Sequence, residues 1–330
     1  MRGMKKNTYL LIALGLLGIL AAGLFLAGRQ AKPAPRVIAL VQLTEVDAST
    51  VGGFRAGMES AGYREGREVV YLSPGPALKI DRLDGIILEH LRRKPDLILV
   101  SSTPATQAVK RLTEGTHIPV VFAPVNDPVS AGIVADLRHP GGHITGIRLP
   151  TGDDLRLKWL AEVAPKVKKV FVPYTPGDMS AQTTLEKISA AAPMFGIELV
   201  SRPVEGKAGV EAALAALPSS VDAIFLPRDS SIESHIETFV AFANARRVPL
   251  CAPSYQQVGK GALMSYGFVH DDIGRQAAHL AQQIFKGVNP ADLPVDMAES
   301  ILSLNMAAAQ RIGLEIPEEV LRQAERIVRE

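Results

Sequence analysis

The sequence is poor in the residues that several common functions require. Its 330 residues include one cysteine, Cys251, which excludes an internal disulfide and favours a small core residue at that position. With 5% aromatic residues, few rings are available to stack on nucleic-acid bases. The first 35 residues hold five of the 36 Lys and Arg residues and none of the 34 Asp and Glu residues. The remainder is therefore slightly acidic, and we expect no nucleic-acid partner.

Catalytic motifs are absent as well. The chain contains no G-x-S-x-G elbow, P-loop, G-x-G-x-x-G, H-E-x-x-H or C-x-x-C. Its seven histidines lack the spacing of metal ligands. Ser101 and Ser102 could act as nucleophiles, but no base can be named for them, and hydrogen bonding is the favoured interpretation. We therefore expect a protein that is not an enzyme and that uses no metal or cofactor.

The N-terminal 35 residues form a separate leader. Met1–Lys6 is cationic, and residues 9–27 run for 19 residues without a charge, long enough to span a bilayer as one hydrophobic helix. Two alternatives remain open, a cleaved signal peptide or an uncleaved signal anchor whose cations hold the N-terminus in the cytoplasm. Either one predicts that residues 36–330 work in the periplasm or another extracytoplasmic space.

A buried strand followed by hydroxyl groups and a helix start occurs in the stretch PDLILVSSTPATQAV. Asp96–Val100 is a short apolar run, typical of a strand buried on both faces of a parallel sheet. Ser101 to Thr103 follow, and Pro104 suits the first turn of a helix. Such a helix start presents unpaired backbone N–H groups and a partial positive charge. It is a site for a carboxylate.

A second strand–helix turn of this kind follows the apolar strand Ala223–Leu226 and leads through PRDSS into a helix near Ile232. Asp229 in this turn has two interpretations, a helix cap or a contact to a ligand. Asp127, in the NDP loop after an earlier strand, has the same two. Arg228 is interpreted equally well as a surface residue or as a ligand contact.

The order of elements predicts the fold class. Strands and helices alternate along the chain, and the two strand–helix turns lie in similar halves. We expect an α/β protein with two lobes, each a doubly wound parallel sheet. Ligands of open α/β sheets bind outside the carboxyl ends of the strands. The loops that follow the strands are therefore the predicted binding region.

Taken in order, the motifs resemble the ABC transporter substrate-binding protein family that includes tryptophan-binding, TrpX-like members. The segments that carry the resemblance are VIALVQL, PDLILVSSTPATQAV, IPVVFAPVNDPVSAG, PYTPGDMSAQ, VDAIFLPRDSS, VPLCAPS and GALMSYGFVHDDIGRQAA. The resemblance implies a type I periplasmic binding protein, with lobes joined by a three-crossover hinge. Lobe 1 would comprise residues 36–149 and 268–295, and lobe 2 residues 150–267 and 296–330.

The resemblance also implies a function and a site. A monomer would close on a small solute, such as an amino acid, and deliver it to an ABC permease in the cytoplasmic membrane. A membrane-anchored ligand sensor with the same fold is the alternative, and an α/β hydrolase is disfavoured because no nucleophile motif occurs. Where family members often carry an acidic loop, this chain has APSY, so the amine contact would rest on Asp229. The ligand-binding residues implied by the resemblance are Gln42, Ser102, Thr103, Ala105, Asp127, Tyr174, Met179, Ser180 and Asp229.

Overall fold

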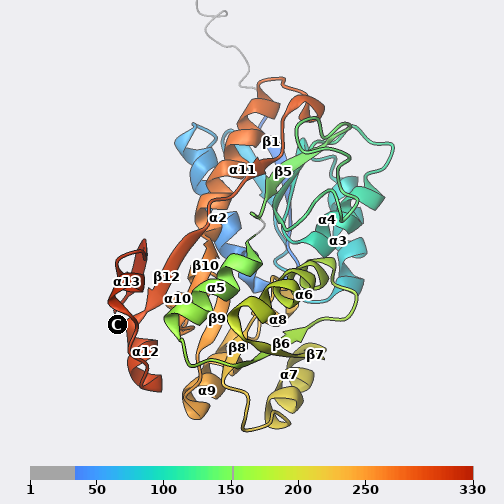
Figure 1. Cartoon of the computed structure of the whole chain (residues 1–330). Coiled ribbons are helices and arrows are strands. Elements are labelled where there is room, and N and C mark those ends of the chain that lie inside the picture. The colour runs from blue at the N-terminus through green and yellow to red at the C-terminus, as the bar shows by residue number, and fades with distance from the viewer. Residues whose placement is uncertain (1–33, 151, 330) are drawn as a thin grey trace, which may run out of the picture. The chain divides into compact units, whose positions relative to one another are not determined.

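The computed structural model describes residues 34–150 and 152–329. These residues form two α/β lobes, each built on a central sheet (Figure 1). The predicted apolar helix at residues 9–27 lies outside the described residues. Within the described part of the chain, no helix combines the length and the apolar character that crossing a bilayer requires.

Lobe 1 is built on a six-stranded parallel sheet in the order β11-β5-β4-β3-β1-β2. Alternate residues of a strand point to opposite faces. Ile38 and Leu40 therefore pack with α2 and α11, whereas Ala39 and Val41 pack with α3 and α4. The elements are β1 (Arg36–Val41), η1 (Glu45–Asp47), α2 (Ala48–Ser60), β2 (Val69–Leu72), η2 (Ile80–Arg82), α3 (Leu83–Arg92), β3 (Leu97–Val100), α4 (Thr103–Leu112), β4 (Val120–Val125), β5 (Ile144–Arg148), α11 (His270–Phe285), η4 (Pro290–Asp292) and β11 (Asp296–Met297).

Lobe 2 is built on a seven-stranded sheet in the order β13-β12-β10-β9-β8-β6-β7. Two strands depart from the predicted parallel arrangement: β12 runs antiparallel to β10, and β13 pairs parallel with β12 and so runs in the same direction as β12. Val170 and Val172 face one core, while Phe171 between them faces the other. The elements are α5 (Asp153–Val163), β6 (Lys169–Tyr174), α6 (Met179–Ala191), η3 (Ala192–Phe195), β7 (Glu198–Pro203), α7 (Gly206–Ala215), β8 (Ala223–Phe225), α8 (Ser230–Glu233), α9 (Ile236–Arg246), β9 (Leu250–Ser254), α10 (Tyr255–Gly259), β10 (Met264–Phe268), β12 (Ile301–Asn305), α12 (Met306–Ile312), α13 (Glu318–Leu321) and β13 (Arg326–Val328).

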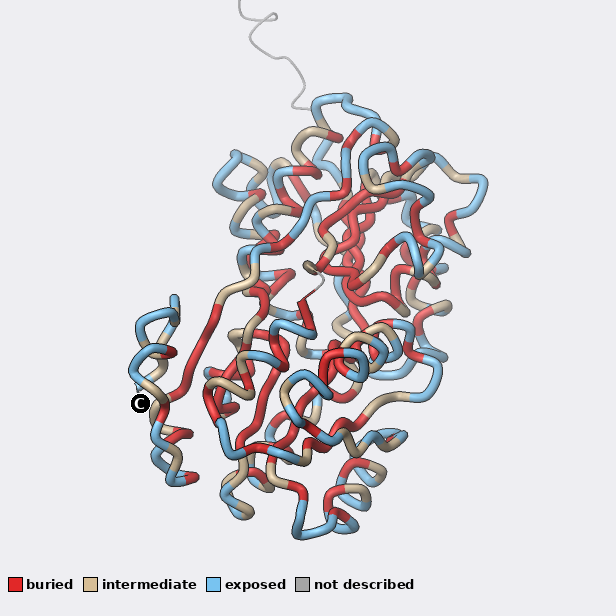
Figure 2. Tube along the Cα trace, in the orientation of Figure 1, coloured by how far each residue is buried: buried red, intermediate tan, exposed pale blue. Residues whose placement is uncertain are grey.

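The chain passes between the lobes three times: from β5 to α5, from β10 to α11, and from β11 to β12. Figure 2 shows both sheets as buried layers, with exposed residues on the outer helices. Polar side chains that follow β4 and β8 contact each other across the lobes. The carboxyl ends of both sheets therefore meet between the lobes, where ligands of open α/β sheets bind.

Glycine residues set the close contact between α2 and α11. A Cβ atom on Gly274 would lie 2.1 Å from the carbonyl oxygen of Thr50, and one on Gly53 would lie 2.1 Å from that of Asp271. No larger residue fits at either position without moving a backbone. Side chains add to the contact, because Thr50 Oγ1 lies 2.8 Å from His270 Nδ1. The start of α11, which follows the second crossover, is thereby fixed against lobe 1.

Candidate functional site

The start of α4 carries strained backbone at the edge of lobe 1. Ser102 has φ 79° and ψ 150°, a region occupied almost only by glycine. Its Oγ accepts a hydrogen bond from the backbone N–H of Ala105 at 3.4 Å and caps α4, at the helix start that the sequence pattern predicted. The strain turns Thr103 toward the other lobe, where its Oγ1 lies 2.8 Å from Ser180 Oγ at the start of α6. One helix start from each lobe therefore meets its counterpart through hydroxyl groups.

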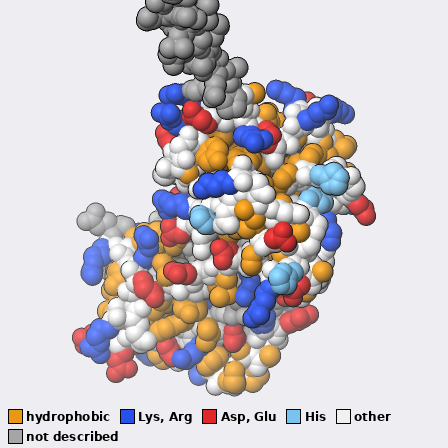
Figure 3. Space-filling view, turned by 90° about the horizontal axis from the view of Figure 1, so that it is seen from above, with side chains coloured by type: hydrophobic (Ala, Val, Ile, Leu, Met, Phe, Trp, Pro, Cys, Tyr) orange, Lys and Arg blue, Asp and Glu red, His pale blue; other side chains and the backbone are white. Residues whose placement is uncertain are grey.

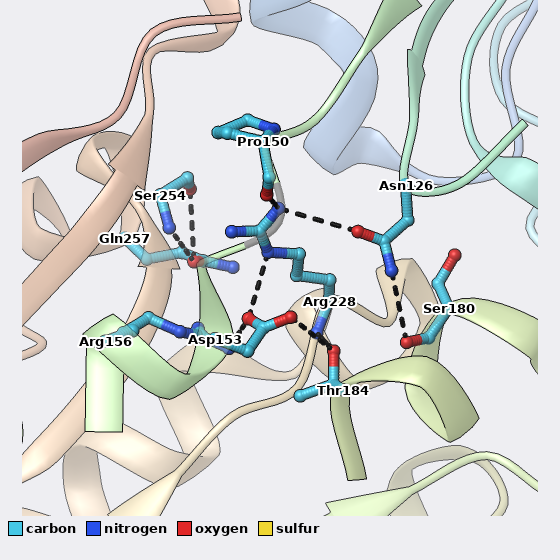
Figure 4. Close-up of polar contacts among 9 residues, drawn as sticks. All are labelled: Asn126, Pro150, Asp153, Arg156, Ser180, Thr184, Arg228, Ser254 and Gln257. Atoms are coloured by element: carbon cyan, nitrogen blue, oxygen red, sulfur yellow. Dashed lines mark hydrogen bonds and ion pairs between the residues drawn. The ribbon is translucent and has the colours of Figure 1, made fainter. Parts of the chain in front are cut away.

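Asn126 and Arg228 extend this contact between the lobes (Figure 4). Asn126 Nδ2 donates to the carbonyl oxygen of Ser180, and its Oδ1 accepts from Arg228 Nη1, both at 3.5 Å. Arg228 Nη1 also donates to the carbonyl oxygen of Pro150 at 2.7 Å, at the first crossover. One arginine thus contacts lobe 1, lobe 2 and the first crossover.

Asp153 holds this arginine and a second one in place. Its Oδ1 accepts from Arg228 Nε at 3.1 Å and from Arg156 Nη2 at 2.9 Å, and its Oδ2 accepts from Thr184 Oγ1 at 3.2 Å. Burial alone would raise the pKa of Asp153, but Arg228 and Arg156 hold it below its usual value. The guanidinium of Arg156 stacks 4.1 Å from the ring centroid of Phe225. Because all three charged groups are buried, each depends on the others for compensation.

A small internal cavity of about 30 Å³ lies between the lobes. Three polar side chains with unused hydrogen-bonding capacity line it. Arg228 Nη2 and His270 Nε2 have no partner among the described residues, and Glu233 accepts a bond at only one of its oxygens. Burial lowers the pKa of His270 to about 4, so the ring is neutral at pH 7. The other lining residues are Val46, Asp47, Ser102, Thr103, Pro124, Asn126, Leu149, Ser180, Ser230 and Phe268.

Two carboxyl groups reach this cavity from opposite lobes, Asp47 from lobe 1 and Glu233 from lobe 2. Burial raises the pKa of Asp47, although Ser101 Oγ donates to its Oδ1 at 2.6 Å and two backbone N–H groups donate to its Oδ2. Burial also raises the pKa of Glu233, to about 8. The site is therefore a place where a positive charge from a ligand would be stabilised.

The structure brings some of the predicted ligand-binding residues together. Ser102, Thr103 and Ser180 all line the interlobe cavity. Asp127 and Met179 lie at its rim, in a smaller hollow shared with Thr103 and Ser180. Asp127 closes its own loop, because its carboxylate accepts from two backbone N–H groups and from Ser130 Oγ. Burial would raise the pKa of Asp127, but these hydrogen bonds lower it.

Four predicted residues line neither the cavity nor the smaller hollow: Gln42, Ala105, Tyr174 and Asp229. Ala105 is buried in the lobe 1 core, so only its N–H faces the Ser102 cap. Asp229 uses both oxygens within lobe 2, one for the N–H groups of Ser231 and Ile232, the other for that of Thr175 at 2.8 Å. This is the helix-cap interpretation of Asp229.

The sequence patterns did not single out Asp47, Asn126, Glu233 and His270 as site residues. Asp47 stands in the polar segment after β1, and His270 is the first residue after the β10 crossover. Their positions just after a predicted strand were thus the signal by which Asp47 and His270 could have been found from the sequence. Glu233 is at the end of a four-residue helix, and no sequence pattern distinguishes it from a surface glutamate.

Other features of the surface add little chemistry. On the face seen in Figure 3, Lys and Arg side chains are interspersed with Asp and Glu side chains. Among residues 34–150 and 152–329, no three His, Cys, Asp or Glu side chains are grouped as a metal site would require.

Asp178, at the start of α6, is buried beside Asp229. Burial and the neighbouring carboxylate of Asp229 raise the pKa of Asp178 to about 7.

Comparison with known proteins gives consistent matches over this unit. A family model described as ABC transporter substrate binding protein matches residues 37–328. A tyrosine-binding protein of Clostridioides difficile is 28% identical over 256 residues, which cover 78% of this chain and 73% of that protein. A conserved domain protein of Vibrio cholerae superposes with a TM-score of 0.83 at 30% identity, covering 88% of this chain and 99% of that one. The ABC domain from Streptococcus pneumoniae solved with L-Trp gives a TM-score of 0.80 at 24% identity, over 89% and 100% of the two chains.

Proposed function

The chain belongs to the ABC transporter substrate-binding protein family, and we propose that it captures an α-amino acid between its lobes outside the cytoplasmic membrane. It would then deliver the amino acid to the permease of an ABC importer. Two relatives support this class of ligand, the tyrosine-binding protein and the structure solved with L-Trp. Capture and delivery need a binding site but no reaction, so the function is that of a receptor.

The observation that carries this proposal is the interlobe cavity, which combines a buried arginine with buried carboxyl groups. An α-amino acid is a zwitterion and can compensate both kinds of charge at once. The start of α4 also suits the carboxylate of such a ligand, because it presents hydroxyl groups and the partial positive charge of the helix. A neutral solute would meet the hydrogen bonds but offer no charged group to Arg228 or to the carboxyl groups.

Catalysis is not part of the proposal, because neither serine in the site is hydrogen-bonded to a histidine of the described chain. Ser101 Oγ donates to Asp47 and Ser102 Oγ accepts from an N–H group. The nearby His270 hydrogen-bonds Thr50 through Nδ1. Among the residues that the structure describes, the bonds of neither serine include a histidine, and the one carboxylate among them, that of Asp47, also accepts from two backbone N–H groups of its own turn.

Binding requires the lobes to separate. Ligand pockets for small molecules have volumes of about 300–1,000 Å³, whereas the interlobe cavity measures about 30 Å³. We propose that the three crossovers act as a hinge between residues 36–149 with 268–295 and residues 150–267 with 296–330. The bond between Thr103 and Ser180 would break on opening and form again on closure.

A ligand screen tests the function directly. The full-length protein in detergent is melted in the presence of each of the twenty proteinogenic amino acids and of neutral polyols. We expect one or a few amino acids to raise the melting temperature, because a ligand that binds only the folded state stabilises it by mass action. Stabilisation by a polyol and by no amino acid would contradict the proposal.

A cross-link tests the closure. Thr103→Cys and Ser180→Cys place two thiols where hydroxyl oxygens lie 2.8 Å apart. We expect oxidation to lock the lobes and to stop exchange of a bound radioactive amino acid, and reduction to restore it. The single Thr103→Cys variant is the control, since it cannot form the link. Equal exchange rates in the oxidised and reduced double variant would exclude closure by this contact.

A further inference from the structure

Glu233 is held in a defined position at the interlobe cavity. Its backbone N–H donates to the carbonyl oxygen of Asp229 at 2.8 Å, and its Oε2 accepts from Gln257 Nε2 at 2.6 Å. Gln257 is fixed in turn, because its Oε1 accepts from the N–H and the hydroxyl of Ser254. Glu233 as a whole residue is 4% exposed. It is therefore oriented by a chain of hydrogen bonds from α10, and rotation away from the cavity would break that chain.

Glu233 differs from the other carboxyl groups near the cavity in having an oxygen to spare. Its Oε1 accepts no hydrogen bond from the residues that the structure describes. Both oxygens of Asp47 are used within lobe 1, and both oxygens of Asp153 and of Asp229 are used within lobe 2. A ligand donor can therefore bond to Glu233 Oε1 without displacing a hydrogen bond within the protein.

Arg228 supplies the matching donor from the same lobe. Its Nε and Nη1 are bound to Asp153, Pro150 and Asn126, while its Nη2 is buried without a partner. Arg228 and Glu233 line the same cavity, on either side of the Asp229 cap. Lobe 2 therefore offers one unused cationic donor and one unused acidic acceptor at a single place.

We propose that Glu233 binds the ammonium group and Arg228 Nη2 the carboxylate of an α-amino acid, so that lobe 2 reads the charges shared by all amino acids. This inference rests on the function proposed above. It assigns the amine contact to Glu233 and not to Asp229, whose oxygens are occupied by the start of α8 and by Thr175. Lobe 1 would then close over the ligand with the hydroxyl groups of α4.

Protonation gives the proposed contact a measurable signature. Burial raises the pKa of Glu233 to about 8, and Gln257, Arg156, Asp229 and Asp47 modify it. The carboxyl group is therefore mostly protonated at pH 7 until a cation arrives. An ammonium group that binds there ionises it, and a proton leaves for solvent. The titratable or charged groups around Glu233 are Asp47, Arg156, Arg228, Asp229 and His270.

A cycle of ligand and protein changes tests the ammonium contact. The probes are an amino acid that stabilises the wild type and the same molecule without its amine, such as L-tryptophan and indole-3-propionate. In the wild type, loss of the amine should weaken binding about 30- to several-thousand-fold, because it leaves a buried group badly paired. Glu233→Gln should weaken binding of the amino acid by a similar factor and should bind the two probes nearly equally.

Glu237→Gln is the matched control, because Glu237 is exposed on the neighbouring α9 and has no bond to the cavity. It should behave like the wild type in every titration. If loss of the amine weakened binding to Glu233→Gln as much as binding to the wild type, the inference would be overturned, and the proposal of amino-acid binding would stand. Failure of every amino acid to bind the wild type would overturn the proposed function together with the inference.

Proton release separates a ligand contact from a merely structural role. Calorimetric titration of the wild type at pH 7 in two buffers of different ionisation enthalpy should show release of up to one proton for each amino acid bound. Glu233→Gln should show none. This measurement in the wild type alone also decides the matter if the variant does not fold, since binding without proton release between pH 6.5 and 7.5 would contradict the inference.

Discussion

The starts of α4 and α8 follow the same pattern, an apolar strand and then a turn rich in hydroxyl or acidic residues, but their polar side chains act differently. At α4 the cap is the neutral hydroxyl of Ser102, on strained backbone, and Thr103 reaches the other lobe. At α8 the cap is the carboxylate of Asp229, which is fully buried and bound to three N–H groups. Lobe 1 thus presents neutral groups that can exchange partners, whereas lobe 2 relies on fixed charges.

This difference separates residues that hold a site from residues that can bind. A carboxylate that already accepts several N–H bonds gains little from a ligand, even when it lies beside the site. A residue with one bound and one free oxygen, such as Glu233, is positioned and still has capacity. The comparison predicts that loss of charge in lobe 2 lowers stability or ligand affinity strongly. Changes in backbone or hydroxyl groups at the start of α4 in lobe 1 should have smaller effects.

The largest effect is expected when the charge that anchors the α8 turn is removed. Asp153→Ala leaves Arg156 and Arg228 buried without their shared counter-ion. Breaking a buried ion pair on one side costs about 3–5 kcal/mol. Urea unfolding should show a loss of this size, whereas Asp154→Ala, the exposed neighbour in the same helix turn, should change stability little. Equal losses in both variants would mean that Asp153 acts only as a helix residue.

The next effect is a pH dependence that belongs to lobe 2. The pKa of Glu233 is raised to about 8 in the folded protein, so the folded state binds more protons than the unfolded state below that pH. The stability that this proton contributes is present at low pH and is lost as pH rises through 8. The unfolding free energy should fall by up to about 1.4 kcal/mol per pH unit from this group.

Glu233→Gln, which cannot titrate, should flatten this dependence between pH 7 and 8. Asp178, with a pKa of about 7, loses its contribution mainly below that window, and His270, with a pKa of about 4, stays neutral throughout it. Unfolding in urea at several pH values measures the slope. An equally steep slope in Glu233→Gln would assign the titration to another group.

Substitutions of Asp229 test whether its charge serves the helix or a ligand. Asp229→Ala removes every acceptor of the cap and of Thr175 N–H, at a cost of about 2 kcal/mol. Asp229→Asn keeps a cap acceptor and should cost about 1 kcal/mol or less. Amino-acid affinity, measured by calorimetry, should stay within a few-fold of the wild type in Asp229→Asn. A 30-fold loss would instead place Asp229 at the ligand's amine.

The smallest effect is expected at the start of α4. Ser102 has positive φ, which glycine adopts without strain, and replacement of a serine cap by glycine costs only a few tenths of a kcal/mol. Ser102→Gly should therefore unfold at nearly the same urea concentration as the wild type. Ser102→Ala keeps the strain and loses the cap, at a cost of about 1 kcal/mol. The reverse order of stability would show that the strain is not stored at this residue.

The α/β class, the two lobes and the strand–helix turns could be predicted from local sequence patterns. These features depend on local patterns: an apolar run such as Leu97–Val100 must be buried on both faces, and Pro104 after hydroxyl residues must begin a helix. The resemblance to the family placed Ser102, Thr103 and Ser180 in the predicted site, and the structure brings these three residues to one cavity.

Which acidic residues keep a free hydrogen-bond acceptor depends on contacts that form only in the folded protein. Asp229 and Glu233 lie four positions apart, yet Thr175 N–H occupies Asp229 from another loop, and Gln257 holds only one oxygen of Glu233. Asp153 and Arg228 are 75 residues apart and become partners only after folding. Hydrogen-bond partners and burial depend on segments distant in the chain, and both determine whether a charge is compensated. A local sequence pattern therefore indicates neither the hydrogen-bond partners nor the burial of a charged residue.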